Sequence, residues 1–442
     1  MARRTHEDTT LRVALLGCGN VGLALYELLA EPKNRAALRD RTGLTFDVVG
    51  IAVKSTKKKR SSAPWFDASL LTTDAKALAL RTDVDVVVEL MGGVDGTLDI
   101  LQAALRSGAS VVSGNKALLA IHGRSLARVA FDHGADLRYE AAVAGAIPIL
   151  RVLRDALSGE QVHRVMGIVN GTTNYILSTM AHDGRPYEDV LAEAQSLGLA
   201  ESDPTADVEG FDAASKAAIL ASLAFDCKVS TADVHREGIT NVTSDDVAFA
   251  KQLGFVVKLL AVCELLDGGQ LSVRVHPTMV PVDHPLASVD GSFNAVFVEG
   301  AACGELMLYG RGAGGKPTAS AVLGDLVEVA RSMRRGGAPD VPLAPRVVAR
   351  RPMAEIESAF YLTLDVADQP GVLAAVTQVF GRNGVSIRSM EQVGLGLEAR
   401  LVFVTHVALE GSMAKTMREL RKLKVVDRVG TLLRVIDDER SS

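Results

Sequence analysis

The chain has 442 residues, and 48% of them are apolar, which is enough for two or three domains with sizeable cores. Its formal net charge of −5 argues against general affinity for nucleic acid. The longest apolar run, residues 141–150, is too short to cross a bilayer, and the first ten residues lack a secretory signal pattern. Four scattered cysteines without metal or redox spacing are interpreted as reduced core thiols of a cytoplasmic protein: Cys18, Cys227, Cys263 and Cys303.

A short apolar strand over residues 11–16 leads at once into a glycine-rich turn and then into an apolar helix that reaches Leu29. This strand–turn–helix setting makes the GxGxxG pattern a prediction of a dinucleotide site. The first glycine makes the tight turn, the second lets a pyrophosphate approach the backbone, and the third permits close packing. The alternative is a purely structural turn. The predicted cofactor-binding residues here are Gly17, Gly19, Asn20, Val21 and Gly22.

The second strand, residues 46–53, is expected to end near the adenosine ribose. An acidic residue usually follows there in enzymes that use NAD, but this chain has Lys54 and then a basic cluster, residues 57–60. A cation at this place favours a 2′-phosphate, so we predict NADP, with NAD possible. The alternative is a solvated loop of lysines.

Further αβ units follow, with strands at residues 84–90 and 109–113 and a helix at residues 97–106. In open α/β sheets, ligands lie beyond the carboxyl ends of the strands. Gly92 and Lys116 follow two such ends, so both are predicted to lie in the cleft and to bind the cofactor. For Lys116, a surface loop lysine is the alternative.

The middle of the chain begins with a strand at residues 137–140 and a small-residue turn at residues 141–148, whose carbonyl groups either hold a hard cation or simply pack. A strand at residues 162–169 and a turn at residues 170–174 then precede a helix predicted for residues 175–180. Thr172 or Thr173 is expected to cap this helix, and the free N–H groups at its start suit a carboxylate.

Residues 198–224 form an acidic loop followed by an apolar helix. Asp212 is predicted to cap this helix, which puts Lys216 on the same face four residues later. Burial of the helix would desolvate Lys216, and a desolvated lysine can exchange protons near neutrality. The alternative is a solvated loop with one surface ion pair. The acidic residues expected to converge on the lysine are Glu201, Asp203, Asp207, Glu209 and Asp212.

These motifs together resemble the homoserine dehydrogenases, of the bacterial type with a C-terminal ACT domain, over nearly the whole chain. The resemblance rests on the glycine turn at residues 17–22, Gly114-Asn115-Lys116, the run at residues 167–175 and the Asp203–Lys216 pattern. One departure is Leu199, where family members often carry tyrosine, so a hydroxyl near the substrate is expected to be missing or replaced. The resemblance implies NAD(P)-dependent interconversion of L-homoserine and L-aspartate 4-semialdehyde, in threonine and methionine biosynthesis.

The resemblance also assigns roles to single residues. It implies that Lys216, Lys116 and Asp212 act in catalysis, and that Gly312 returns beside the cofactor before a helix at residues 318–331 that packs on the nucleotide domain. The residues implied to bind substrate are Glu201, Asp207, Gly171 and Thr172. The residues implied to hold a sodium ion are Glu140, Val143, Gly145 and Ile147.

The tail restarts the pattern after a linker rich in Arg, Gly and Pro at residues 332–353. Its predicted order, βαββαβ, is the ferredoxin-like split motif. With Asp-Gln-Pro-Gly at the first turn it looks like an ACT domain, which implies an amino-acid effector, and the chain's implied product suggests L-threonine. A dimerisation module without ligand is the alternative. The predicted effector residues are Asp368, Gly371, Val372 and Leu373.

The predicted fold class is therefore α/β, in three parts. A Rossmann domain at residues 10–140 is completed by residues 305–335, an α+β substrate and dimerisation domain covers residues 141–304, and a linker at 336–356 leads to the ACT domain at 357–438. We expect a homodimer or homotetramer with no nucleic-acid or membrane partner. Two other functions remain open: another NADP-dependent amino-acid dehydrogenase or imine reductase, and a non-catalytic NADP-binding amino-acid sensor.

Overall fold

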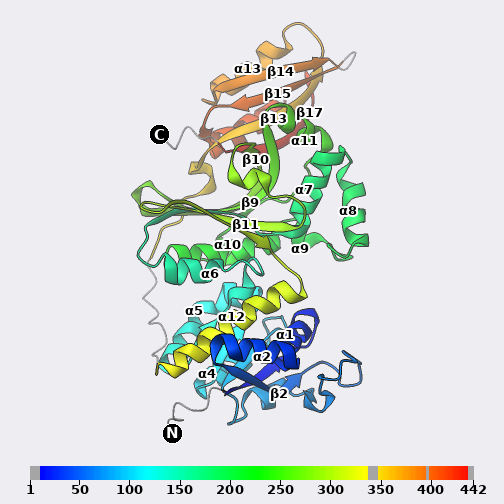
Figure 1. The fold of residues 1–442 in the computed structure, drawn as a ribbon. Coiled ribbons are helices and arrows are strands. Elements are labelled where there is room, and N and C mark those ends of the chain that lie inside the picture. The colour runs from blue at the N-terminus through cyan, green and yellow to red at the C-terminus, as the bar shows by residue number, and fades with distance from the viewer. Residues whose placement is uncertain (1–9, 337–346, 395–397, 437–442) are drawn as a thin grey trace. The chain divides into compact units, whose positions relative to one another are not determined.

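The computed structural model describes residues 10–336, 347–394 and 398–436 (Figure 1). Their contacts divide the chain into two compact units. One contains the described residues of Met1–Gly159, Ala218–Thr231 and Gly310–Val347, and the other contains those of Glu160–Ala217, Ala232–Tyr309 and Val348–Ser442. None of the helices in the described ranges is long and apolar enough to cross a membrane.

The first unit contains a six-stranded parallel sheet in the order β3-β2-β1-β4-β5-β6. This is the strand order of a doubly wound dinucleotide fold, as predicted. The strands are β1 (Thr10–Leu16), β2 (Thr45–Ala52), β3 (Leu71–Thr72), β4 (Val86–Glu89), β5 (Ser110–Ser113) and β6 (Leu137–Arg138). The helices are α1 (Asn20–Ala30), α2 (Pro32–Thr42), α3 (Ala75–Ala79), α4 (Thr97–Arg106), α5 (Lys116–Asp132), α6 (Ile149–Arg151) and α12 (Gly315–Arg334).

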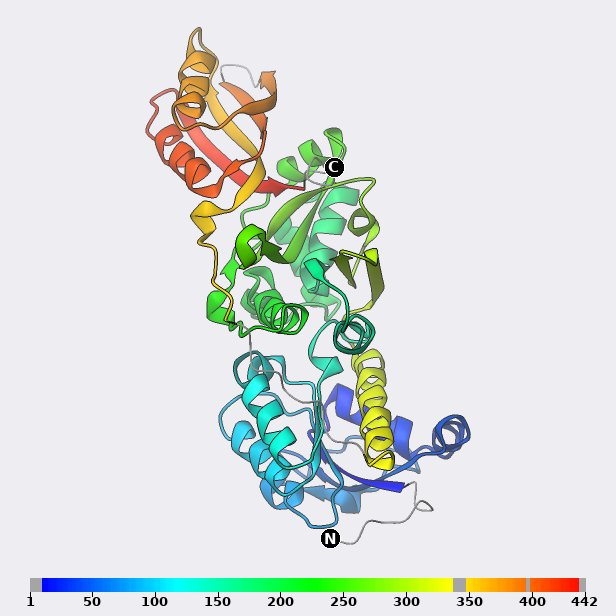
Figure 2. The same cartoon turned by 90° about the vertical axis from the view of Figure 1, so that its left-hand side faces the viewer.

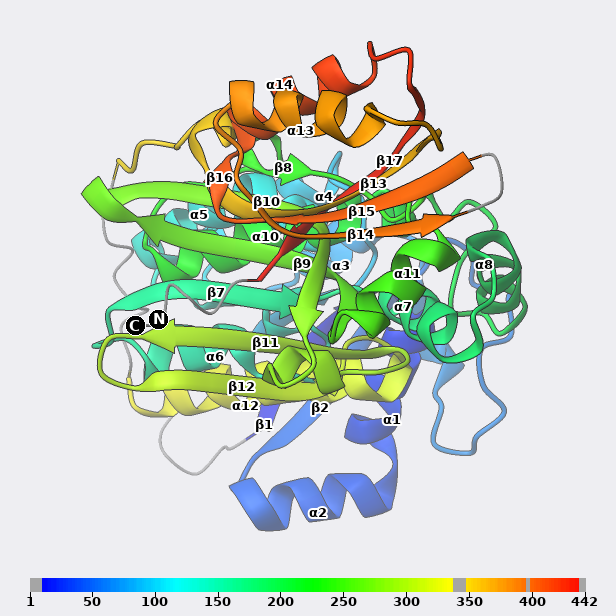
Figure 3. The ribbon, with the colours of Figure 1, turned by 90° about the horizontal axis from the view of Figure 1, so that it is seen from above.

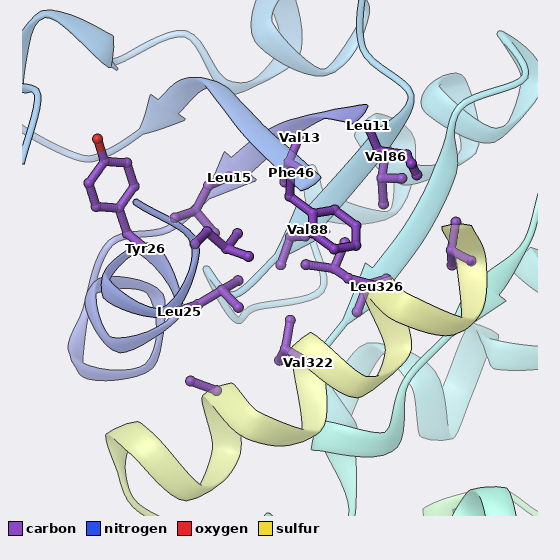
Figure 4. Packing of buried hydrophobic residues seen from close by; sticks show 14 of the residues in the cluster. Leu11, Val13, Leu15, Leu25, Tyr26, Phe46, Val86, Val88, Val322 and Leu326 are labelled. Atoms are coloured by element: carbon purple, nitrogen blue, oxygen red, sulfur yellow. The ribbon is translucent and has the colours of Figure 1, made fainter. Parts of the chain in front are cut away.

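The core of this unit joins two segments that lie far apart in the sequence (Figure 4). Val322 and Leu326 of α12 pack into the same buried cluster as Leu25 of α1 and the strand residues Val13 and Val88. The apolar residues of α12 recur at helical spacing, so its buried face is set by sequence, and burial of each large side chain contributes about 2 kcal/mol. The predicted packing of this helix on the nucleotide domain is therefore confirmed, although the helix also extends through Arg334 into the expected linker.

The second unit contains a mixed sheet that begins with β12-β11-β7-β9-β10. Its strands are β7 (Val162–Ile168), β8 (His235–Arg236), β9 (Phe255–Leu266), β10 (Gln270–Pro281), β11 (Phe293–Gly300) and β12 (Gly304–Arg311). Its helices are α7 (Gly171–Asp183), α8 (Tyr187–Ser196), α9 (Thr205–Val208), α10 (Phe211–Ala224) and α11 (Ser244–Gln252). The α10 helix continues into the first unit, since the boundary falls after Ala217.

The C-terminal strands continue this sheet in the order β17-β13-β15-β14. The elements are β13 (Glu357–Ala367), α13 (Val372–Arg382), β14 (Ile387–Gly394), β15 (Glu398–Thr405), β16 (Ala408–Leu409), α14 (Glu410–Leu420) and β17 (Val426–Val435). The two helices cover the same face of the strands (Figure 2 and Figure 3). The predicted βαββαβ module is confirmed. Its last strand also pairs in parallel with β10, through Thr278 opposite Arg434 and Met279 opposite Val435.

Three local predictions were wrong. The strand expected to reach residue 140 ends at Arg138, and Glu140 opens a single 3-10 turn. The interpretation of all four cysteines as core thiols fails for Cys303, which is exposed, whereas Cys227 and Cys263 are buried. The expected linker begins later than residue 332 because α12 continues to Arg334, and residues 337–346 lie outside the described residues.

Candidate functional site

The glycine turn at residues 17–22 has the geometry that a dinucleotide loop needs. Gly17 has a φ of +105°, and a Cβ there would lie 2.6 Å from the carbonyl oxygen of Leu90. A Cβ on Gly22 would lie 2.2 Å from the carbonyl oxygen of Gly17, so α1 and the turn can approach only without side chains. At Gly19 a Cβ would meet no atom within 4 Å. Because α1 begins at Asn20 without a side-chain cap, its first N–H groups remain for an anion.

The ends of β4 and β5 are organised by a buried carboxylate that the sequence reasoning missed. Glu89 accepts hydrogen bonds from the N–H of Met91 at 2.8 Å and from the Ser113 hydroxyl at 2.7 Å. The Asn115 side chain donates to the carbonyl oxygen of Gly93 at 2.6 Å and accepts from the N–H of Leu118. Asn115 therefore caps α5, and Lys116 is the first helical residue, half-buried. A glutamate ending a valine run was the signal available for Glu89.

Lys54 lies after the end of β2 and is exposed, as are Lys57, Lys58 and Lys59. The loop is shaped by Arg60, whose guanidinium donates to the carbonyl oxygens of Ser55 and Lys58, each at 2.8 Å. Exposed lysines on a loop near the end of β2 remain compatible with a 2′-phosphate, because long cationic side chains can reach such a group from solvent.

The predicted cation loop brings together residues from distant parts of the first unit. Gly145 has a φ of +56°, and a Cβ there would lie 2.5 Å from the carbonyl carbon of Gly312. The N–H of Ala146 donates to the carbonyl oxygen of Arg311 at 3.0 Å. The close approach of these two backbone segments therefore requires glycine at residue 145.

The side chain of Glu140 is already engaged within that loop. Its carboxylate accepts from the N–H groups of Leu150 at 2.7 Å and Arg151 at 2.8 Å, at the start of α6. Burial, together with repulsion from Asp325, raises the pKa of Glu140 to about 7. The carbonyl oxygen of Ile147 accepts from the N–H of Ile149 at 2.8 Å. Any cation here would therefore rely on main-chain oxygens such as those of Val143 and Gly145 more than on the Glu140 carboxylate.

Lys216 lies at the centre of the second group of predicted residues. Its ammonium donates to the carboxylate of Asp212 at 2.7 Å and to the carbonyl oxygen of Val169 at 2.6 Å. Only 9% of the residue is exposed, so the ion pair is buried and the surface alternative is excluded. The two bonds use two of the three N–H donors of the ammonium and fix its direction.

Asn170 connects this lysine pair to the second carboxylate. Its amide donates to Asp207 at 2.7 Å and to Asp212 at 2.9 Å, while its oxygen accepts from the N–H of Thr173 at 2.9 Å. The hydroxyl of Thr172 donates to the carbonyl oxygen of Leu199 at 2.7 Å and lies 3.2 Å from the Asp207 carboxylate. One amide thus caps α7 and holds two carboxylates, the buried Asp212 and the half-buried Asp207. Asn170 lies within the run at residues 167–175, but the sequence alone predicted no role for it.

Several details of this region differ from the predictions. The α10 helix begins at Phe211, so Asp212 lies in its first turn instead of capping it. The α7 helix begins at Gly171 with Asn170 as its cap, earlier than predicted and without Thr172 or Thr173 in that role. The pairing of Asp212 with Lys216 depends only on their i, i+4 spacing within the helix. It is therefore retained although the helix begins at a different residue from the one predicted.

The predicted convergence of five carboxylates on Lys216 was also wrong. Asp203 accepts from the N–H of Thr205 at 3.1 Å, and Glu209 accepts from the Thr240 hydroxyl at 2.9 Å. Glu201 is exposed. Only some carboxylates of the acidic loop therefore contribute to the buried pair. Others, such as Asp203, stabilise turns, because short acidic side chains accept hydrogen bonds from nearby backbone N–H groups.

Two other motif residues have structural roles. Gly171 lies so close to the next loop that a Cβ would be 2.7 Å from the carbonyl oxygen of Ser292. The amide of Asn174 donates to the carbonyl oxygens of Val289 at 3.0 Å and Gly291 at 2.9 Å. Lys258, whose pKa is lowered by burial, donates to the carbonyl oxygen of Val289 at 2.6 Å. Together they fix the position of α7 and hence of Asn170.

Comparisons with known proteins agree along the whole chain. The family model described as homoserine dehydrogenase matches residues 148–327, its NAD binding domain matches residues 17–140, and the ACT domain matches residues 360–425. A homoserine dehydrogenase of Corynebacterium glutamicum is 48% identical over 435 residues, covering 96% of each chain. One of Mycobacterium tuberculosis is 47% identical, covering 97% of this chain and 98% of the relative.

This chain belongs to the homoserine dehydrogenase family. A solved homoserine dehydrogenase from Thiobacillus denitrificans superposes with a TM-score of 0.90 at 36% identity, over 97% of this chain and 98% of that one. A hyperthermophilic archaeal homoserine dehydrogenase, solved in complex with NADPH, has a TM-score of 0.62 at 28% identity and covers 73% of this chain and 98% of that one. Members of the homoserine dehydrogenase family are NAD(P)-dependent oxidoreductases, so this chain is an oxidoreductase with a C-terminal ACT domain.

Proposed function

We propose that this chain catalyses the reversible reduction of L-aspartate 4-semialdehyde to L-homoserine, with NADP(H) preferred over NAD(H), in threonine and methionine biosynthesis. The observation that carries the proposal is the buried ammonium of Lys216, held between Asp212 and the Val169 carbonyl. Family membership supplies the reaction class, and this lysine supplies the group that the reaction needs at the C4 oxygen. The proposed domain layout is the one expected from sequence, with boundaries near residues 140, 304 and 357.

The glycine turn fits a dinucleotide, because Gly19 leaves open space in front of the first N–H groups of α1. Gly17, Gly19, Asn20, Val21 and Gly22 would hold its pyrophosphate, with Gly92 and Gly312 along its path and Lys54 at the 2′-phosphate. When bound, the nicotinamide supplies or accepts the hydride at C4 of the substrate. The structure solved with NADPH is that of a relative, and it supports the same cofactor here.

The chain's own residues then handle charge and protons. Lys216 donates a proton to the aldehyde oxygen as it becomes an alkoxide, and takes it back in the oxidation direction. Asp212 orients the ammonium. The Asn170 amide donates to both Asp212 and Asp207 and so fixes the position of one carboxylate relative to the other. Glu201 and Asp207 would bind the substrate ammonium, while Thr172 and the N–H groups near Gly171 would face its carboxylate. Lys116 is the second proposed catalytic lysine.

The proposal includes a sodium ion on the loop of Glu140, Val143, Gly145 and Ile147, held mainly by main-chain oxygens because the Glu140 carboxylate already accepts two N–H groups. It also includes L-threonine as an inhibitor bound at Asp368, Gly371, Val372 and Leu373. Gly371 has a φ of +90° and caps α13, and Asp368 is exposed, which suits a loop that receives a free amino acid. Truncation near Met353 should abolish threonine inhibition if the ACT domain holds the effector.

Absorbance at the nicotinamide band tests the proposed reaction directly. Purified full-length protein should reduce NADP when L-homoserine is added, and should do so less efficiently with NAD. L-serine and L-threonine serve as matched hydroxy amino acids in the same assay. Reduction with either of them and none with homoserine would contradict the proposed substrate, while no reduction with any would favour the sensor.

A further inference from the structure

The second unit contains a large cleft that the proposed reaction does not use. Its volume is about 1040 Å³, and it is lined on one side by β8 and the loop that follows, and on the other by α14 and β17 of the ACT domain. The charged side chains of its lining include Arg236, Glu237, Glu410, Arg418, Arg421 and Arg434. A cleft of this size is large enough for a metabolite.

The cleft is electropositive although the chain as a whole is acidic. Five arginines and three glutamates line it, a surplus of two positive charges, whereas the full chain carries −5. Such a local reversal of sign attracts anions, because a concave wall focuses the field of its charges.

The carboxylates in the lining are already satisfied. Glu410 accepts two hydrogen bonds from Arg434, each at 2.9 Å, and Glu237 accepts from His235 at 2.8 Å and is ion-paired with Arg434. Glu209 accepts from the Thr240 hydroxyl at 2.9 Å. A ligand ammonium would therefore have to displace an existing partner, which disfavours a zwitterionic amino acid in this cleft.

Two of the arginines have donors to spare. Arg418 and Arg421 are exposed, stand three residues apart at the end of α14, and make no ion pair or side-chain hydrogen bond within the described ranges. A guanidinium presents paired N–H donors that match the oxygens of a phosphate. The unused binding capacity of the cleft is therefore cationic and suits a phosphate-bearing ligand.

One wall of the cleft also holds the turn that precedes Asp212. The guanidinium of Arg236 lies 3.5 Å over the ring of Phe211 and donates to the carbonyl oxygen of Glu209. The N–H of Ile239 donates to the carbonyl oxygen of Val208 at 2.8 Å. This turn begins α10, so its position sets that of Asp212 and Lys216.

We propose that this cleft is a binding site for a small polyvalent anion of the organic phosphate class, separate from the effector site proposed at Asp368–Leu373. Arg418 and Arg421 bind the phosphate oxygens. The anion also competes with the Glu209 carbonyl for Arg236, which loosens the turn before Asp212 and weakens substrate binding. This last step rests on the proposed function, whereas binding itself does not.

Calorimetric titration of the full-length protein with inorganic pyrophosphate tests binding, with NADP saturating so that the nucleotide site is filled. One further site is expected. The variant R418S/R421S should weaken binding by about tenfold or more, because it removes two charge-assisted contacts. The control K415S/K422S removes the same charge from exposed positions on and just after the same helix, outside the lining, and should bind as wild type does.

Two results would overturn the proposal. One is that pyrophosphate does not bind to the wild type. If sedimentation then shows that R418S/R421S changes the oligomer whereas K415S/K422S does not, a second copy of the chain fills the cleft in place of an anion. An equal loss in both variants is the other, because it would indicate general charge attraction.

Kinetics test the coupling. Pyrophosphate should raise the KM for homoserine by about threefold or more with little change in kcat, and R418S/R421S should not respond. Binding without a change in KM would overturn the coupling through Arg236. Turnover measured without pyrophosphate reports on the proposed reaction alone, so a failure of that reaction is distinguished from a failure of the cleft.

Discussion

The start of α1, where we propose cofactor binding, and the starts of α7 and α10, where we propose substrate binding, are built by opposite means. At α1 the side chains are absent: Gly17 and Gly22 approach so closely that a Cβ on either would overlap backbone. At α7 and α10 the side chains are dense and interlocked, with Asn170 holding two carboxylates and Lys216 bound to one of them. The first arrangement leaves main-chain N–H groups that suit the proposed phosphate, and the second fixes the one ammonium that we propose as the proton donor. Substitutions in the two regions should therefore impair the protein for different reasons: steric overlap with backbone at α1, and loss of specific side-chain bonds at α7 and α10.

Removal of the lysine should have the largest effect on the side-chain-built region. Lys216→Ala should lower kcat by about a hundredfold to ten-thousandfold, the usual contribution of a positioned acid–base group, with NADP affinity nearly unchanged. Stopped-flow turnover and fluorescence titration of NADPH measure the two quantities. Lys251→Ala, at an exposed position on α11, is the control. Wild-type turnover in Lys216→Ala would show that another group, Lys116 above all, handles the proton.

In the glycine turn, two similar changes should separate stability from binding. Gly22→Ala places a methyl group 2.2 Å from a backbone oxygen and should cost about 3 kcal/mol of unfolding free energy. Gly19→Ala meets no atom within 4 Å, so its unfolding free energy should change by about 0.5 kcal/mol or less, while NADP affinity falls. Thermal unfolding and calorimetry check both. Equal unfolding temperatures for the two variants would refute the close packing of Gly22.

Asn170 tests whether the interlocked region depends on its central amide. Asn170→Ala removes the α7 cap and both carboxylate bonds and should cost on the order of 3 kcal/mol of unfolding free energy. Asn170→Ser keeps a capping oxygen and should recover part of that stability, but the KM for homoserine should stay raised because Asp207 and Asp212 lose their shared donor. A serine variant with wild-type KM would show that the cap alone matters.

Cofactor choice should show the smallest effect, because Lys54 is exposed and its charge is screened by salt. Lys54→Glu should reduce the preference for NADP over NAD, measured as a ratio of kcat/KM values, by about tenfold. Lys33→Glu makes the same charge change on α2 and should leave the ratio as it is. Equal losses with both cofactors in Lys54→Glu would remove it from the 2′-phosphate site.

Much of this fold could be predicted from the sequence, because the deciding signals are local. A strand, a glycine turn and an apolar helix in succession specify the first αβ unit, and the alternation of strands and helices in the tail specifies βαββαβ. Lys216 and Asp212 also follow from one helix, since their spacing places them on one face even though the helix begins at Phe211. Each of these inferences involves residues within about one helical turn or one strand of each other.

The tertiary structure decided what lies between segments. Spacing along the chain does not show that the Val169 carbonyl binds Lys216, that Asn170 joins Asp207 to Asp212, or that Glu89 ties β4 to β5. Nor does it show that β17 of the ACT domain pairs with β10 and so forms one wall of the cleft that Arg236 connects to α10. Each of these contacts depends on how elements dozens of residues apart are placed against one another. Packing of the whole unit sets that placement, and local propensities do not predict it.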